Sequence, residues 1–199
     1  MIGQSFGAYT ALALASDRVN FSGPSCQTES YLLNPSLIVQ CQGQQLQVVQ
    51  PSFSDRRIKS MLLINALTSN VFTPDNLASV KIPVMMIAAT ADVLAPPLSE
   101  QIKPYTHLGS EHKYLVLWEN ASHFSSLQAT DAEVSLPQVF VGPDPAISHD
   151  YLKVLAVSFF DQYLLDNYLA KVYLDGDYAT YLSKKEMPLK LIEGQLNPW

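Results

Sequence analysis

The chain has 199 residues, enough for one domain with a sizeable core, and 48% hydrophobic with 15% charged residues is the composition of a globular protein. Its net charge of -6 argues against nucleic acid or an anionic membrane surface as the main partner. No apolar run approaches the roughly 18 residues that a membrane-spanning helix needs.

The first residues of the chain carry a motif for a nucleophilic serine. The sequence Gly-Gln-Ser-Phe-Gly at residues 3–7 fits G-x-S-x-G, the nucleophile elbow, in which a serine lies on a strained turn between a strand and a helix. We expect a side chain at Gly3 or at Gly7 to collide with the neighbouring strand or the following helix. The alternative is a plain Gly/Ser turn that caps the helix expected over residues 8–17.

Residues 18–57 lose all periodicity apart from a short apolar piece at 36–39, which predicts one short helix. Such a long connection is usually functional or loosely ordered, so this excursion is a candidate lid or cleft wall. It holds both cysteines, Cys26 and Cys41. They form either a disulfide or two free buried thiols, and the sequence leaves both open.

Three short apolar runs predict buried strands, and helices separate them. Between the first two strands, Thr73 and Pro74 are suited to the cap and the first position of a short helix. A further helix is expected over residues 98–108. The alternation of strand and helix predicts an α/β domain with a parallel sheet. The expected strands are 58–65, 82–89 and 113–118.

Residues 125–148 form a second irregular stretch, again a candidate lid or cleft wall, and we expect a long amphipathic helix after it with Ser148 as its N-cap. A shorter helix is predicted over 177–183, followed by a tail that Pro188 and Pro198 keep irregular. We find no repeat and no domain boundary, so a single domain is expected over 1–199.

A catalytic triad is indicated by three residues that follow strands, in the chain order Ser5, Asp92, His123. A serine hydroxyl is a poor nucleophile near neutral pH until an imidazole accepts its proton, and a carboxylate must fix the imidazole tautomer. Neighbouring parallel strands lie roughly 5 Å apart, so groups just beyond their ends can converge.

Each assignment has a rival. Asp92 could be an exposed turn carboxylate, and Glu119, closer to its strand, is the substitute acid. Among the histidines, only His123 ends a buried strand. Its competitors are His107, His112 and His149.

These features resemble the catalytic half of an α/β-hydrolase. The resemblance is carried by the elbow, the Ala-Thr-Ala-Asp-Val-Leu-Ala-Pro segment at 89–96 and the Asn-Ala-Ser-His-Phe segment at 120–124, and it runs from the elbow through the helix around Phe159. More narrowly, these features are similar to those of predicted dienelactone hydrolases and platelet-activating-factor acetylhydrolase-like esterases. The resemblance implies an eight-stranded sheet and ester hydrolysis without a cofactor, with Ser5 as nucleophile, Asp92 as orienting acid, His123 as base and the Phe6 amide in the oxyanion hole.

The chain departs from this family in what precedes the elbow. An α/β-hydrolase has four strands and most of a fifth there, and the loop after the third supplies the second oxyanion amide. We therefore expect the C-terminal half of an α/β-hydrolase fold, a parallel sheet flanked by helices with the N-terminal strands missing. Impaired activity and self-association through an exposed sheet edge are expected consequences. Any signal sequence would precede Met1, so the compartment stays open.

The expected substrate is a small or medium ester, with Tyr31, Leu37 and Ile38 as candidate cleft residues or plain packing. No metal site is expected, because the group His107, Glu111 and His112 is best explained as a solvated loop. The alternative function is a non-catalytic remnant or binding module completed by a partner chain. The same triad could also hydrolyse amides, peroxides or halides.

Overall fold

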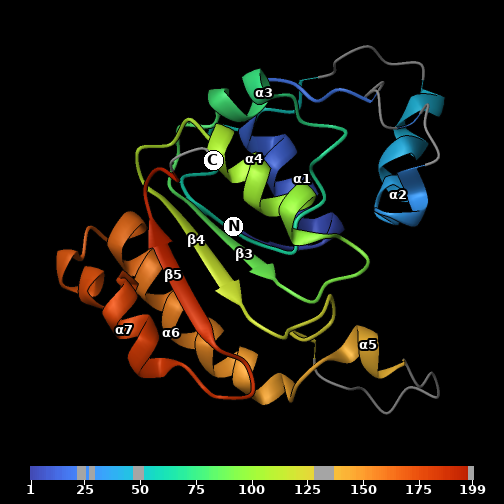
Figure 1. The fold of residues 1–199 in the computed structure, drawn as a ribbon. Coiled ribbons are helices and arrows are strands. Elements are labelled where there is room, and N and C mark those ends of the chain that lie inside the picture. The colour runs from blue at the N-terminus through green and yellow to red at the C-terminus, as the bar shows by residue number, and fades with distance from the viewer. Residues whose placement is uncertain (22–25, 27–29, 47–51, 128–136, 197–199) are drawn as a thin grey trace.

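The buried apolar runs of the sequence form a five-stranded sheet (Figure 1). The structure is a computed structural model, and it describes residues 1–21, 26, 30–46, 52–127 and 137–196. The strands follow the order β1-β2-β3-β4-β5, in which β1 to β4 run parallel and β5 runs antiparallel to β4. Their bounds are Ile2–Gln4, Met61–Ile64, Val84–Ala89, Lys113–Trp118 and Leu189–Glu193.

The last strand, β5, corrects two expectations: the tail is not irregular, and the sheet is mixed rather than all parallel. Leu189 and Leu191 are buried while Lys190 between them is exposed. This alternation is typical of a strand at a sheet edge with one solvated face, whereas the central strands β2, β3 and β4 are buried on both faces. Pro188 lies just before the strand, where its missing amide removes no ladder hydrogen bond.

Helices cover both faces of the sheet (Figure 1). One face packs against α1, α3 and α4, and the other against α6 and α7, so each face has its own hydrophobic cluster. A turn of π-helix, η4, leads directly into α4, and η5 joins α6 to α7. The bounds are α1 Phe6–Ala15, α3 Pro74–Ser79, η4 Leu98–Ile102, α4 Lys103–His107, α6 Pro145–Leu164, η5 Tyr168–Leu174 and α7 Gly176–Leu182.

Local sequence was sufficient to predict the N-cap of α3 but not that of α6. The predicted cap at Thr73 is confirmed, because its side chain accepts a hydrogen bond from the Asn76 amide at 3.2 Å. The predicted cap at Ser148 is wrong: α6 begins at Pro145, with Asp144 as the N-cap. Ser148 lies inside the helix, and its hydroxyl donates to the Ser125 carbonyl at 2.6 Å.

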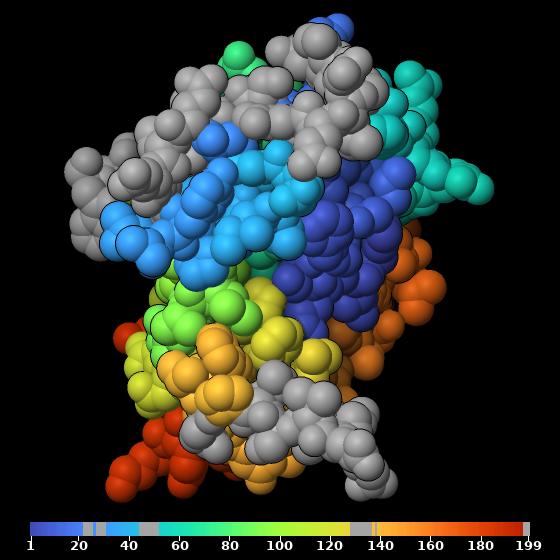
Figure 2. Space-filling view, turned by 90° about the vertical axis from the view of Figure 1, so that its right-hand side faces the viewer, coloured from blue at the N-terminus to red at the C-terminus, as the bar shows by residue number. Residues whose placement is uncertain are grey.

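The two predicted excursions contain short helices. The first holds η2 (Ser30–Leu32), α2 (Leu37–Gln40) and η3 (Cys41–Leu46), and the second holds α5 (Gln138–Val141). Figure 2 shows residues 30–46, in light blue, on the surface beside the dark blue N-terminal residues. Within both excursions, 22–25, 27–29, 47–51 and 128–136 lie outside the described residues, as does Pro198 of the tail.

Cys26 and Cys41 form a disulfide, which decides between the two alternatives left by the sequence. The bond closes the segment that leads into α2 and η3. No helix in the described part of the chain is long and apolar enough to cross a membrane.

We expect replacement of both cysteines, as Cys26→Ser with Cys41→Ser, to lower the free energy of unfolding. The disulfide closes a sequence separation of 15 residues. A loop of this size predicts a loss of about 3 kcal/mol through the greater entropy of the unfolded chain. Urea unfolding should show this loss and also show that a reductant no longer alters the double variant. Equal stability of the oxidised parent and the double variant would contradict the expectation.

Candidate active site

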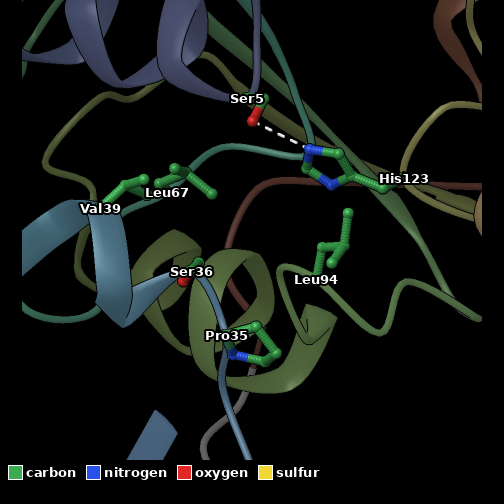
Figure 3. A pocket seen from close by; sticks show the side chains of 7 residues that line it. All are labelled: Ser5, Pro35, Ser36, Val39, Leu67, Leu94 and His123. Carbon is green, nitrogen blue, oxygen red and sulfur yellow. Dashed lines mark hydrogen bonds between the residues drawn. The ribbon is translucent and has the colours of Figure 1, made fainter.

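Three polar side chains meet where the parallel strands end. Ser5 follows β1, Asp92 lies in the turn after β3, and His123 lies in the turn after β4. The His123 Nε2 atom lies 2.9 Å from the Ser5 Oγ atom, and its Nδ1 atom lies 2.6 Å from Asp92 Oδ2. Figure 3 shows the serine hydroxyl facing the imidazole ring. Residues far apart in the sequence thus form one continuous hydrogen-bonded chain.

Ser5 has the backbone of a strained turn, with φ 52° and ψ -115°. A positive φ is uncommon for a residue with a side chain and costs on the order of 1–3 kcal/mol. Flanking hydrogen bonds hold it, because the Ser5 amide donates to the Ile64 carbonyl at 2.8 Å and the Tyr9 amide donates to the Ser5 carbonyl at 3.0 Å. The serine therefore joins β1 directly to α1.

The two glycines of the motif differ. A Cβ atom on Gly3 would lie 2.3 Å from the Gly7 carbonyl oxygen, so the expected collision is confirmed there. A Cβ atom on Gly7 would meet nothing within 4 Å among the described residues, so that half of the expectation is wrong. Gly7 lies on the open side of the first turn of α1, whereas Gly3 lies under that turn.

Asp92 is held in one orientation. It is 3% exposed, and its Oδ1 atom accepts hydrogen bonds from the backbone amides of Leu94 and Ala95, each at 2.8 Å. Its Oδ2 atom is thereby directed at the His123 ring. Asp92 is thus a buried partner of the histidine rather than an exposed turn carboxylate.

The turn that carries His123 is fixed by two residues that the sequence reasoning missed. The His123 carbonyl accepts hydrogen bonds from Gln4 Nε2 at 2.9 Å and from Asn65 Nδ2 at 3.1 Å. Asn65 is fully buried with φ 47°, and its Oδ1 atom accepts the Ala89 amide at 2.9 Å. The sequence signal that could have identified Asn65 is its position directly after a buried strand, because asparagine tolerates a positive φ.

The rival residues have other contacts. Glu119 forms an ion pair with Lys190 of β5. His149 Nε2 lies 3.0 Å from the Ser126 carbonyl, the His112 ring stacks 5.2 Å from the Tyr163 ring, and His107 is the last residue of α4.

A pocket of about 200 Å³ opens beside Ser5 and His123 (Figure 3). The candidate cleft residues Tyr31, Leu37 and Ile38 are not among the side chains that line this pocket. Leu37 is buried, and Ile38 points to solvent with 54% exposure. The sequence could not predict which residues of 35–39 face the pocket, because a single short helical turn shows no hydrophobic periodicity. The other lining residues are Pro35, Ser36, Val39, Leu67 and Leu94.

Phe6, whose amide was assigned to an oxyanion hole, is the first residue of α1. First-turn amides of a helix have no intrahelical partner and lie at the positive end of the helix dipole. Among the described residues, no group of three His, Cys, Asp or Glu side chains could hold a metal ion.

Compared with models of known protein families and with curated proteins, the chain matches none. What the fold and the site define is an α/β protein with a mostly parallel sheet and a hydrogen-bonded Ser-His-Asp arrangement at its strand ends.

We expect Gly3→Ala and Gly7→Ala to change stability in opposite directions. At Gly3 the new methyl group overlaps backbone, and such overpacking costs about 1–3 kcal/mol. At Gly7 the methyl group meets open space inside a helix, where alanine is favoured over glycine by roughly 0.5–1 kcal/mol. Unfolding in urea measures both variants. Equal losses at the two positions would show that the close approach of β1 to α1 does not exist.

Proposed function

We propose that this chain is a serine-dependent ester hydrolase that acts through an acyl-enzyme. Ser5 is the nucleophile, His123 the general base and Asp92 the acid that orients the histidine. The observation that carries the proposal is the unbroken hydrogen-bonded chain from Ser5 through His123 to Asp92. In this arrangement a serine proton has an acceptor, and the resulting imidazolium has a buried counter-ion.

The reaction follows from these contacts. His123 Nε2 takes the proton as Ser5 Oγ attacks the ester carbonyl carbon, and Asp92 stabilises the protonated ring through Nδ1–H. The tetrahedral intermediate collapses, the carbon–oxygen bond to the alcohol breaks, and His123 returns the proton to the leaving alkoxide. Water, activated by the same histidine, then hydrolyses the acyl-Ser5 ester.

We assign the Phe6 backbone amide as one donor to the oxyanion. It belongs to the residue after the nucleophile, at the amino end of α1. A second donor is not assigned to any residue of this chain. Because removal of one such donor typically lowers the rate about 100- to 1000-fold, we expect a slow esterase.

The finer fold assignment belongs to the same proposal. We infer that β1 to β4 correspond to the carboxyl-terminal strands of an α/β-hydrolase, in the dienelactone hydrolase and platelet-activating-factor acetylhydrolase-like branch. The strained Ser5 turn between β1 and α1 supports this, as does the order Ser, Asp, His after the ends of β1, β3 and β4.

The substrate is proposed to be an ester with a short apolar acyl group. The pocket beside Ser5 has a volume of about 200 Å³, and apolar side chains supply most of its wall. An apolar cavity of about 150 Å³ is enough for a benzene-sized molecule, so this pocket fits an acyl chain of similar bulk.

A second candidate function has one observation in its favour. Within the described residues, β1 pairs with β2 alone, and Ile2 of this strand is more than half exposed. Such an edge can accept a strand from another chain. We therefore propose, as the alternative, a binding module in which a second chain adds a strand beside β1. Light scattering of the purified chain distinguishes this case, since a stable monomer counts against a required partner.

We expect Ser5→Ala to lower the hydrolysis of p-nitrophenyl butyrate at least about 1000-fold, because it removes the hydroxyl that is hydrogen-bonded to His123. Labelling by a fluorophosphonate probe should be lost in the same variant. Equal rates in the parent and Ser5→Ala would exclude the esterase proposal.

The two acids provide a matched pair. Asp92→Asn removes the group that fixes the His123 tautomer, and we expect kcat to fall on the order of 1000-fold or more. Glu119→Gln alters only the ion pair with Lys190, so its kcat should stay within about twofold of the parent. The same p-nitrophenyl butyrate assay measures both. If the Glu119 variant were the inactive one, the acid would have been assigned to the wrong residue.

A further inference from the structure

One wall of the pocket beside Ser5 comes from residues 34–40, which include the short helix α2. Behind this wall lies Glu100 of η4, a carboxylate with 0% exposure. No step of the proposed hydrolysis uses Glu100. Burying a carboxylate is costly unless its oxygens are well hydrogen-bonded, so its burial calls for an account of what it holds.

One carboxylate oxygen holds the loop after β2. Glu100 Oε2 accepts hydrogen bonds from the backbone amides of Thr68 at 2.6 Å and Ser69 at 2.9 Å. In addition, the Thr68 hydroxyl donates to the Glu100 backbone carbonyl. This loop also carries Leu67, which lines the pocket.

The other oxygen holds the wall. Glu100 Oε1 accepts hydrogen bonds from Ser36 Oγ and Gln40 Nε2, both at 3.0 Å, and from Asn34 Nδ2 and Ser69 Oγ. The wall and the loop after β2 therefore meet at a single carboxylate. Among the described residues, Glu100 has no salt bridge, so uncharged donors stabilise its charge.

Besides Glu100, the described residues that hold this wall include Asn70, whose amide donates to Gln40 Oε1 at 3.0 Å, and the Cys26–Cys41 disulfide next to Gln40. Few apolar side chains of the outer part are buried. Leu32 and Leu33, which precede it, are 93% and 84% exposed, and Ile38 within it is 54% exposed. Leu37 is the buried apolar residue of α2. A segment with so little buried apolar surface gains little from packing, so its hydrogen bonds, those to Glu100 among them, are needed to fix its place.

We propose that Glu100 is the positioning residue that fixes this wall beside Ser5 and thereby limits the length of the acyl group. The inference rests on the proposed esterase function. The wall residues Pro35, Ser36 and Val39 bound the pocket on the side facing Ser5 and His123 (Figure 3). When the carboxylate is lost, the wall is free to move outward, and longer acyl chains enter.

The test is Glu100→Gln, which keeps the shape of the side chain. Its amide NH₂ group must face either the backbone amides of Thr68 and Ser69 or the side-chain donors of the wall. In either orientation two hydrogen-bond donors face each other, so the hydrogen bonds on that side are lost. We expect the ratio of kcat/KM for p-nitrophenyl octanoate to that for p-nitrophenyl butyrate to rise at least about fivefold.

Two further variants separate positioning from general loss of stability. Leu155→Ala creates a cavity in α6, on the opposite face of the sheet, and should leave the ratio within about twofold of the parent. Asn34→Ala removes one wall-side donor without altering a residue that lines the pocket, and it should shift the ratio in the same direction as Glu100→Gln. Asn34→Ala also serves if Glu100→Gln does not fold.

Amide hydrogen exchange gives a readout that does not need activity. In Glu100→Gln or Asn34→Ala we expect the amides of α2 to exchange at least about tenfold faster while those of β3 keep the parent rate. Unchanged exchange in α2 would overturn the proposal, as would an unchanged acyl-length ratio in an active enzyme. If the parent hydrolyses no ester and Ser5 is not labelled, the proposed function fails, and exchange alone then decides whether Glu100 positions the wall.

Discussion

Parallel backbone pairing from β1 to β4 is the interaction on which the site depends. The register aligns Gln4 with Ile64, Ile64 with Ile87 and Ile87 with Val116, so the chain leaves each strand close to the same line across the sheet. A turn of a few residues then suffices to bring Ser5, Asp92 and His123 together. A shift of one strand by a single residue would break the contact, because the hydrogen bonds joining the three side chains tolerate only a few tenths of an ångström.

Strands buried on both faces could be predicted because their apolar runs are unbroken, and the triad followed from what stands after them. Features that depend on contacts between distant segments could not be predicted from the sequence. The edge strand β5 was missed because one of its faces is solvated, and the first turn of α6 because Asp144 precedes the apolar pattern. Gln4, Asn65 and Glu100 are ordinary polar residues in the sequence, and their roles come only from the carbonyl, amide and hydroxyl groups that folding places around them.

The site combines a serine in a strained backbone conformation with rigid supports. The unfavourable backbone of Ser5 persists because β1 and α1 are both anchored, the first to β2 and the second in the core beneath the sheet. The histidine turn is held by its carbonyl and the aspartate by backbone amides, so each member has support independent of the other two. By contrast, the proposed substrate wall is held by the Cys26–Cys41 disulfide and by hydrogen bonds to the Glu100 carboxylate. The proposed chemistry and the proposed acyl-length selectivity thus depend on separate parts of the fold.

The two edge strands of the sheet, β1 and β5, differ in charge. Along β5, Lys190 and Glu193 each form an ion pair, and charges of this kind discourage a foreign strand from docking there. β1 has no charged side chain. If the β1 edges of two copies paired around a two-fold axis, the pair would be closed, because only the charged β5 edges would then lie outside.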